Sequence, residues 1–333
     1  MTEQAAAVVG GQIPTDGVCV VGGDLGGTQF RIALADGEGR LLHRTAIRTE
    51  ASQGLQAVLQ RIKGSIRDTI ALAPGMVAQI AVAAPGPLDP WKGIIYTPPN
   101  LPGWDEVPLK DVLEDAFGIP VSIGNDANLA ALAEWRFGAA RGSNHVVYMT
   151  VSTGVGGGVV DSGKLLLGYG GGAAEVGHMT IDMDGPRCNC GNHGDLEALA
   201  SGTAIARRAV EAVRAGGQSS IVGLAGGLER VAAEHVVDAA RQGDELALRV
   251  LRRAGYCLGV GVANLMMVYD PEVIVLGGGV IMNARDLMFE EMHRAVAERA
   301  MEAFRERTRI AVAELGDDVG IYGAIALALS QLG

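Results

Sequence analysis

Residues 18–28 read VCVVGGDLGGT, and QFRIALAD and GRLLHRTAI follow at 29–36 and 39–47. Apolar residues alternate with other residues in these runs, which predicts a strand, a glycine turn, a strand, a turn and a third strand. The same plan returns at 145–167 as HVVYMTVSTGVGG, GVVDSG and KLLL. This duplication predicts an α/β protein of two similar lobes facing each other across a cleft, where small ligands usually bind.

Helical periodicity accompanies both strand units. The apolar residues of 55–70 recur at helical spacing, and residues 273–276 form an apolar strand that runs into glycines and a helix. Residues 216–227 are expected to be a flexible connector. Further helices are expected at 127–137, 203–214, 228–241, 244–269 and 320–332.

Composition limits the possible partners and compartment. The 333 residues are 48% hydrophobic and 20% charged, which is typical of a globular protein of two lobes. A net charge of −11 argues against a nucleic-acid surface. Because no run approaches a membrane span and the first residues lack the basic start of a signal peptide, we expect a cytoplasmic protein with a flexible arm at 1–17. Cys19 and Cys257 lie in apolar segments, which fits a reducing compartment.

The first glycine turn is not a dinucleotide-binding loop, because a strand rather than a helix follows it. A glycine hairpin still lets several backbone N–H groups approach a phosphate. Asp24 is the candidate to hold Mg²⁺ through water, and an ordinary tight turn is the alternative. The residues expected to contact phosphate are Gly26, Gly27 and Thr28.

Two later glycine segments extend this pattern. Residues 152–158, which include Thr153 and Gly154, repeat the hairpin in the second unit. Gly277, Gly278 and Gly279 follow the apolar strand and would leave room for a nucleoside. The order phosphate, phosphate, adenosine resembles the nucleotide site of the actin, sugar kinase and heat-shock ATPase superfamily. This resemblance implies an actin-like (ribonuclease H-like) fold and ATP as a ligand.

Residues 175–197 read EVGHMTIDMDGPRCNCGNHGDLE. His178, Cys188 and Cys190 are ligand types and spacings typical of a zinc site. The run resembles the ROK family of sugar kinases and sugar-responsive repressors, whose signature is C-x-C-G-x-x-G-C-x-E. Asp195 stands where the family has its third cysteine, so the fourth zinc ligand is either Asp195, a harder donor than thiolate, or His193.

Asp126 is the candidate catalytic base. It follows a short apolar strand and begins a helical pattern in GNDANLAALAE, which also matches the family. A sugar hydroxyl becomes a good nucleophile when a positioned carboxylate accepts its proton. The alternative is that Asp126 caps the helix, and both roles are compatible.

The ROK resemblance implies the sugar ligands. Mapped onto matching positions, they are Asn100, Asn125, Asp126, Glu175, His178 and Glu197. Amide groups suit sugar hydroxyls because both donate and accept hydrogen bonds. For Asn100, which follows two prolines, a turn-forming role is the alternative.

The resemblance covers residues 18–329 and implies an ATP- and Mg²⁺-dependent hexokinase with structural Zn²⁺. The carboxylates and imidazole suit the hydroxyls of D-glucose, phosphorylated to glucose 6-phosphate, and an N-acetyl group would need additional volume. N-acetylmannosamine, N-acetylglucosamine and fructose kinases are alternatives, and polyphosphate in place of ATP stays open. A ROK regulator would need a helix-turn-helix, for which 17 residues before the first strand leave no room.

The lobes are expected at 18–125 with 318–333, and at 126–317, the second carrying the metal-binding loop. The last helix returns to the first lobe, as the family implies. Closure of the lobes on a sugar would exclude water from the reaction. The expected partners are a hexose and ATP, with assembly as a homodimer or homotetramer.

Overall fold

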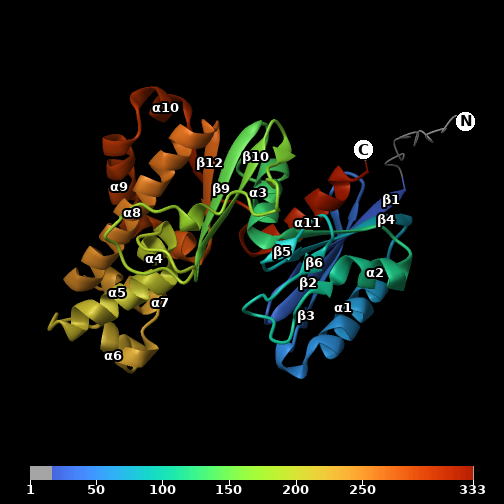
Figure 1. Cartoon of the computed structure of the whole chain (residues 1–333), viewed down its shortest axis with the longest axis horizontal. Helices are drawn as coiled ribbons and strands as arrows, with labels where there is room; N and C mark the ends of the chain where they lie inside the picture. The colour runs from blue at the N-terminus through green and yellow to red at the C-terminus, as the bar shows by residue number, and fades with distance from the viewer. Residues whose placement is uncertain (1–16, 333) are drawn as a thin grey trace, which may run out of the picture. The chain divides into compact units, whose positions relative to one another are not determined.

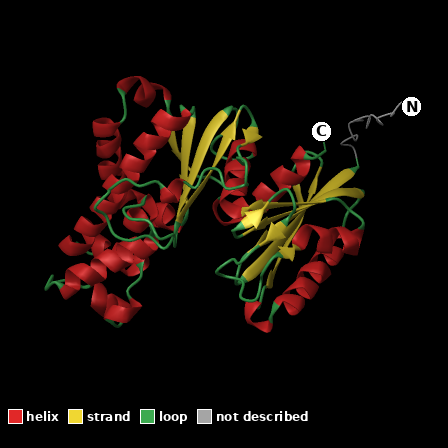
Figure 2. Ribbon diagram, viewed as in Figure 1, coloured by secondary structure: helices red, strands yellow, loops and turns green. Residues whose placement is uncertain are grey.

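The computed structural model describes residues 17–332, so all but the last residue of the predicted arm lies outside the described residues. The chain divides into two compact units. The first runs up to Leu129 and also takes the chain from Asp318 onward, and the second is Ala130–Asp317. In each unit, helices pack beside a β-sheet (Figures 1 and 2).

The two main sheets have the same plan. In the first the strand order is β3-β2-β1-β4-β8, and in the second it is β11-β10-β9-β12-β13. The first three strands of each sheet are antiparallel neighbours, and the last two are parallel additions. The predicted duplication is therefore confirmed. The strands are β1 Val18–Leu25, β2 Gln29–Asp36, β3 Leu41–Arg48, β4 Met76–Ala84, β8 Val121–Asn125, β9 His145–Val151, β10 Val155–Asp161, β11 Lys164–Leu165, β12 Val273–Gly277 and β13 Arg309–Val312.

Helices supply the remaining layers. A small third sheet is formed by β5 Leu88–Asp89, β6 Ile94–Ile95 and β7 Val107–Pro108. The α-helices are α1 Leu55–Ile70, α2 Leu109–Phe117, α3 Asp126–Arg136, α4 Leu196–Ala200, α5 Gly202–Arg214, α6 Ile221–Ala225, α7 Ala233–Arg241, α8 Glu245–Tyr269, α9 Gly279–Arg299, α10 Glu302–Arg307 and α11 Val319–Ser330. Short 3₁₀ turns are η1 Ala51–Gln53, η2 Val176–His178, η3 Leu228–Arg230 and η4 Gly316–Asp318.

The alternation of side chains along β1 determines which face of the first sheet carries Asp24. Cys19, Val21 and Leu25 of β1 point into the core that the sheet shares with α1. Gly22 and Asp24 point to the opposite face, where α11 packs, and a Cβ atom at Gly22 would lie 2.7 Å from Ile325 Cγ1. Asp24 is thereby placed under the first turn of the last helix.

The core of the second unit lies between its sheet and a long helical pair. Helix α8 packs along α9, and its glycines allow close approach, because a Cβ atom at Gly255 or Gly259 would lie 2.3 Å from a backbone oxygen of α9. The alternating residues Val147 and Met149 of β9 face this core. No helix within residues 17–332 combines the length and apolar character needed to cross a bilayer.

Two predicted segments differ from the structure. The helix predicted at 228–241 is broken into η3 and α7, because Ala232 adopts an extended backbone and its N–H donates to the His235 ring at 3.0 Å. The connector predicted at 216–227 contains α6, which buries Ile221 completely. At 228–241 the apolar residues keep helical spacing across the backbone break, so the pattern does not reveal the break. At 216–227 the apolar run of α6 is too short to predict a helix.

Candidate functional site

The first glycine turn lies against the proline loop that carries Asn100. Gly26 N donates to Gln29 O at 2.9 Å, and Thr49 Oγ1 donates to Gly26 O at 2.7 Å, so the turn closes a hairpin as predicted. A Cβ atom at Gly27 would lie 2.6 Å from the carbonyl oxygen of Asn100. The side chain of Asn100 is exposed, not buried as the amide argument assumed. The turn and this predicted sugar ligand are therefore neighbours within the first unit.

Asp24 is a crowded and partly buried carboxylate. Burial raises its pKa to about 6, while Arg31, whose guanidinium lies 3.7 Å away, lowers it and Asp126 raises it. Gly320 makes this position possible, since a Cβ atom there would lie 2.5 Å from Asp24 Cγ. A carboxylate in this state gains from a nearby cation, as the Mg²⁺ prediction requires.

The raised pKa of Asp24 gives a measurable pH dependence. Its folded pKa of about 6 exceeds the value of 3.8 for the free group, so the native state holds this proton more tightly and loses stability as pH rises through that interval. We expect Asp24→Asn to gain ~2 kcal/mol relative to wild type between pH 4 and pH 7. Denaturant unfolding at several pH values measures this. Asp105→Asn, at an exposed position of the same unit, is the control, and a pH-independent difference for Asp24→Asn would contradict the assignment.

Asn125, not Asp126, caps helix α3. Its Oδ1 accepts from Ala127 N at 3.0 Å and from Asn128 N at 3.2 Å, which is the N-cap arrangement. Asp126 is the first residue of the helix and is exposed, with one oxygen 2.7 Å from Ala127 N. The N-cap bonds therefore come from Asn125, and Asp126 accepts an additional hydrogen bond from Ala127 N within the first turn.

In the second unit, the glycine hairpin at 152–158 contacts two other predicted motifs. They are the Glu-x-Gly-His run at 175–178 and the end of the cysteine motif at Glu197. Glu197 Oε2 accepts from Val155 N at 2.9 Å, and a Cβ atom at Gly154 would lie 2.4 Å from that same oxygen. Gly177 of the Glu-x-Gly-His run packs so closely that its Cβ atom would lie 2.0 Å from Val155 O. The glycines of both motifs are thus required by close packing, and Glu197 and His178 flank the start of β10.

A cavity of about 590 Å³ opens beside the same hairpin. Ser152 and Thr153 border it, and Thr203 ties the hairpin to α5 by donating to Thr153 O at 2.8 Å. Gly278 has φ +89° and lies against Val151 O, which brings Gly279 to the cavity wall. No sequence signal identified the remaining lining residues, which come from α5, α7, the residues just before α7, and α9, and include Ala206, Val237 and Asn283.

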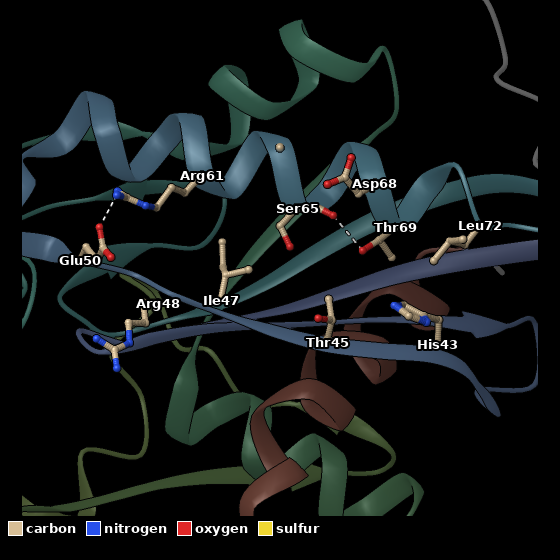
Figure 3. A pocket seen from close by; sticks show the side chains of 11 residues that line it. His43, Thr45, Ile47, Arg48, Glu50, Arg61, Ser65, Asp68, Thr69 and Leu72 are labelled. Carbon is tan, nitrogen blue, oxygen red and sulfur yellow. Dashed lines mark hydrogen bonds and ion pairs between the residues drawn. The ribbon is translucent and has the colours of Figure 1, made fainter.

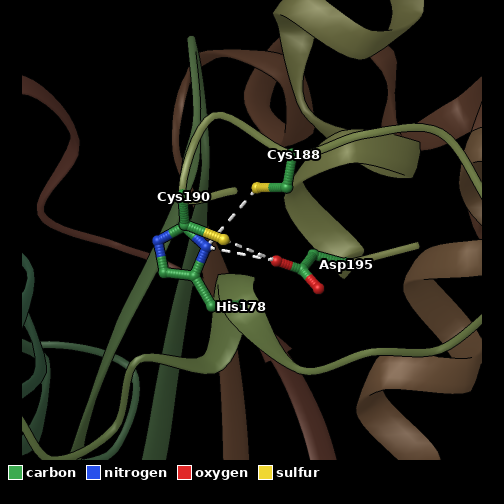
Figure 4. Close-up of side chains that lie close together, drawn as sticks. All are labelled: His178, Cys188, Cys190 and Asp195. Atoms are coloured by element: carbon green, nitrogen blue, oxygen red, sulfur yellow. Dashed lines mark hydrogen bonds and ion pairs between the residues drawn. The ribbon is translucent and has the colours of Figure 1, made fainter. Parts of the chain in front are cut away.

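The metal prediction corresponds to a compact cluster. His178, Cys188, Cys190 and Asp195 each offer a ligand atom, and these atoms lie within 4.8 Å of one another (Figure 4). His178 Nδ1 is 3.6 Å from both Cys188 Sγ and Asp195 Oδ2, and Cys190 Sγ is 3.0 Å from Asp195 Oδ2. The alternative ligand His193 is exposed and is not in the group found among residues 17–332.

The two 3.6 Å separations from His178 Nδ1 fit a tetrahedral zinc ion, whereas the 3.0 Å hydrogen bond between Cys190 Sγ and Asp195 Oδ2 would lengthen on metal binding. Zinc bonds of about 2.0–2.3 Å keep ligand atoms roughly 3.3–3.8 Å apart. Burial and the neighbouring Cys190 and Asp195 raise the pKa of Cys188 to about 11, and a bound cation would reverse this. Burial also opposes ionisation of Asp195, but hydrogen bonds from Cys190, Cys188 and Thr180 outweigh it and lower its pKa. The cluster thus contains a carboxylate ready to bind a cation.

A second hollow lies in the first unit, and none of the motifs described above contributes to it. It has a volume of about 600 Å³ and lies between α1 and β3 (Figure 3). Arg61 and Glu50 form an ion pair at one end, and His43 and Leu72 line the other. None of the predicted site residues lines it.

The comparisons with known proteins agree with these motifs. The model of the ROK family matches residues 20–331. The chain belongs to the ROK family. It is 38% identical over 315 residues to a glucokinase of Thermotoga maritima, covering 94% of this chain and 98% of that one.

Two solved structures extend the similarity to the fold. A ROK hexokinase from Thermus thermophilus matches with a TM-score of 0.84 and 36% identity, covering 94% of this chain and 99% of that chain. A ROK glucokinase from Streptomyces griseus, solved in complex with glucose and AMPPNP, matches with a TM-score of 0.75 and 32% identity over 94% and 99%. The ROK chain described here has their actin-like, two-domain α/β fold.

Proposed function

We propose that this ROK protein transfers the γ-phosphate of ATP to the 6-hydroxyl of D-glucose, giving glucose 6-phosphate and ADP. The observation that carries the proposal is the exposed Asp126 carboxylate at the start of helix α3, in a chain similar to glucokinases along most of its length. A hydroxyl attacks phosphorus effectively when such a carboxylate accepts its proton.

In the proposed reaction Asp126 accepts the proton of the sugar hydroxyl while the hydroxyl oxygen bonds to the γ-phosphorus. The bond from that phosphorus to the β–γ bridging oxygen breaks, and ADP leaves with the electron pair. Bound Mg²⁺ supplies charge neutralisation for the phosphates. Asp24 is the residue proposed to hold it, because its crowded carboxylate is stabilised by a cation.

ATP is proposed to place its adenosine in the cavity beside the second hairpin. The volume of about 590 Å³ and the mixture of small, apolar and polar lining residues suit a nucleoside. Backbone N–H groups of Thr153, Gly154, Gly27 and Thr28 are the proposed phosphate contacts, while Gly26 closes the turn through its bond to Gln29 O. Of the three predicted glycines, Gly279 lines the cavity and leaves room for the nucleoside next to the backbone. Gly277 and Gly278 pack against Tyr148 and Val151 and so position the chain that carries Gly279.

Six side chains are the proposed sugar ligands. Asn125 uses Oδ1 as a helix cap, which leaves its Nδ2 group as the donor. Glu197 commits Oε2 to Val155 N, which leaves Oε1 as the acceptor. The complete set is Asn100, Asn125, Asp126, Glu175, His178 and Glu197.

The metal cluster is proposed to hold structural Zn²⁺. His178, Cys188, Cys190 and Asp195 would bind the ion, which would draw the metal loop and the η2 turn together. His178 presents Nδ1 to the cluster, so its Nε2 lies on the opposite side of the ring. Zinc would thereby fix the ring tautomer and orientation with which His178 meets the sugar.

Filling the proposed adenosine cavity should weaken ATP binding selectively. Ala206 lies on the cavity wall, and Ala206→Trp should raise the KM for ATP by at least ~10-fold while the KM for glucose changes little. Steady-state kinetics with each substrate varied in turn measure this. Arg208→Trp is the matched control, because Arg208 is exposed on the same helix outside the lining. Equal effects of the two variants would contradict the nucleotide assignment.

Removing the charge of Glu175 should affect the other substrate. We expect Glu175→Gln to raise the KM for glucose by ~10-fold or more and to leave the KM for ATP nearly unchanged, because only the sugar loses its charged acceptor. A variant with both KM values unchanged would remove Glu175 from the proposed set.

The reaction itself is tested by product identity. Purified protein with glucose and Mg-ATP is assayed by coupling to glucose-6-phosphate dehydrogenase, which reports phosphate at the 6-position through NADPH. Robust NADPH formation that depends on glucose, ATP and Mg²⁺ supports the proposal. ADP release without glucose 6-phosphate would overturn the proposed regiochemistry.

A further inference from the structure

The two carboxylate oxygens of Asp195 lie in different surroundings. Oδ2 faces the cluster, 3.0 Å from Cys190 Sγ and 3.6 Å from His178 Nδ1. In Figure 4 the other oxygen points away from the ring and the sulfurs. That oxygen, Oδ1, lies 2.8 Å from Asn192 Nδ2 and 3.3 Å from Thr180 Oγ1. Because the Asp195 side chain is fully buried, these contacts replace water at the carboxylate.

Asn192, Thr180 and Asp195 form a closed triangle of hydrogen bonds. Asn192 Nδ2 has two hydrogens, and it donates to Asp195 Oδ1 and to Thr180 Oγ1, the latter at 2.9 Å. The Thr180 hydroxyl then donates its own hydrogen to Asp195 Oδ1. The donors of the triangle are therefore directed either at Asp195 Oδ1 or at the Thr180 hydroxyl, which itself donates to Oδ1.

Backbone contacts fix this triangle beside the cysteines. Cys188 N donates to Asn192 O at 2.8 Å, so Asn192 is tied to a residue of the cluster. Residues Thr180 and Asp195 are paired as an antiparallel bridge, and Leu196 N donates to Met179 O at 3.0 Å. The backbone that carries the amide and the hydroxyl is therefore held in place by contacts that involve no metal.

We propose that Asn192 and Thr180 are positioning residues that make Asp195 a one-oxygen metal ligand and so allow a carboxylate to replace the family's thiolate. An unrestrained carboxylate rotates and offers either or both oxygens. Hydrogen bonds onto Oδ1 withdraw that oxygen and leave Oδ2 for the metal. A thiolate has a single ligand atom and needs no such restraint. This inference rests on the zinc site proposed above, and it extends that site to residues outside the ligand set.

The proposed role predicts that the effect of Asn192→Ala on zinc affinity depends on whether residue 195 is aspartate. In the wild-type background, Asn192→Ala should lower zinc affinity by ~10-fold or more, the scale seen when outer partners of metal ligands are removed. In an Asp195→Cys background, the same substitution should lower zinc affinity by no more than about threefold, because no second oxygen remains to be held. Zinc affinity is measured by chelator competition on the full-length protein. Equal losses in the two backgrounds, or no loss in wild type, would overturn the proposal.

Controls separate this role from general damage to the loop. Asn189→Ala removes an exposed amide between the two cysteines and should leave zinc affinity unchanged. Thr180→Val gives a second measurement that needs no cysteine variant. In protein loaded with Co²⁺ in place of zinc, Thr180→Val and Asn192→Ala should each broaden or shift the ligand-field bands. This is expected because Asp195 loses its single coordination mode in either variant. Unchanged Co²⁺ spectra in both variants would overturn the proposal even if Asp195→Cys fails to fold.

Failure of the proposed kinase function is distinguishable from failure of this inference. Zinc affinity and Co²⁺ spectra do not depend on turnover, so the dependence of Asn192 on Asp195 is measurable in a protein that phosphorylates no sugar. Wild-type protein that phosphorylates glucose but binds no zinc would overturn the positioning role and leave the catalytic assignment intact.

Discussion

Replacing Asp126 by asparagine is expected to lower kcat for glucose phosphorylation by at least ~10²-fold, the usual scale for loss of a general base. Asparagine nearly matches the shape of aspartate but does not accept the proton of the sugar hydroxyl. Because Asn125 provides the helix cap, the variant should keep its fold and its melting temperature. Steady-state kinetics and a thermal unfolding curve on the same preparation measure both properties.

Asp105→Asn is the matched control, since it removes an exposed carboxylate from the same unit. The KM or Kd for glucose should change little in Asp126→Asn, because the amide still hydrogen-bonds to a hydroxyl. Turnover of Asp126→Asn near the wild-type value would remove Asp126 from the mechanism.

The second large effect is on stability. Glu134 in α3 is fully buried, and its carboxylate accepts from Ala139 N at 2.8 Å and from Glu314 N and Leu315 N at 3.0 Å each. Glu134→Ala would leave these three backbone donors without their acceptor. We expect the free energy of unfolding to fall by ~3 kcal/mol or more. Denaturant unfolding of wild type and variant gives the difference.

Glu302→Ala, an exposed glutamate of the same unit, controls for loss of an acidic side chain and should change the unfolding free energy by less than ~0.5 kcal/mol. Glu134→Gln keeps one carbonyl oxygen and should fall between wild type and Glu134→Ala. A loss below ~1 kcal/mol for Glu134→Ala would mean that water replaces the carboxylate at these N–H groups.

The fold was predictable from sequence because its signals are periodic and repeated. Strand alternation in 29–36 and 145–151, glycine turns and the strand before Gly277 each follow from local steric rules, and the structure has these elements. The break at Ala232 was not predictable in this way, since apolar residues continue at helical spacing on both sides of it. Only the bond from Ala232 N to the His235 ring reveals why the chain restarts there.

Some residues of the candidate site were likewise identifiable from the sequence, and others were not. Motif residues such as Cys188, Cys190 and His178 were identifiable because a metal demands particular ligand types at short spacing, and the structure brings them together with Asp195. The wall of the second-unit cavity was not identifiable, because Ala206 and similar lining residues carry no distinctive chemistry. Their role depends on helices that meet only in the folded chain.

Asn125 illustrates a third case, in which the residue was identified but its local role was not. The sequence pair Asn-Asp at the start of a helix offers two residues that commonly serve as N-caps. Which one caps depends on where the first helical turn begins, and that is fixed by the preceding strand β8. The outcome matters for the proposed function, because Asn125 makes the N-cap hydrogen bonds while the Asp126 carboxylate stays exposed at the first helical position.

Substrate selectivity tests the central claim most directly. ADP formation is measured for purified protein with Mg-ATP and, in separate series, glucose, mannose, fructose, N-acetylglucosamine and N-acetylmannosamine. A site whose carboxylates and imidazole bond unmodified hydroxyls should give its highest kcat/KM with glucose and a lower value with mannose. A higher kcat/KM for fructose or for either N-acetyl sugar than for glucose would contradict the glucokinase assignment.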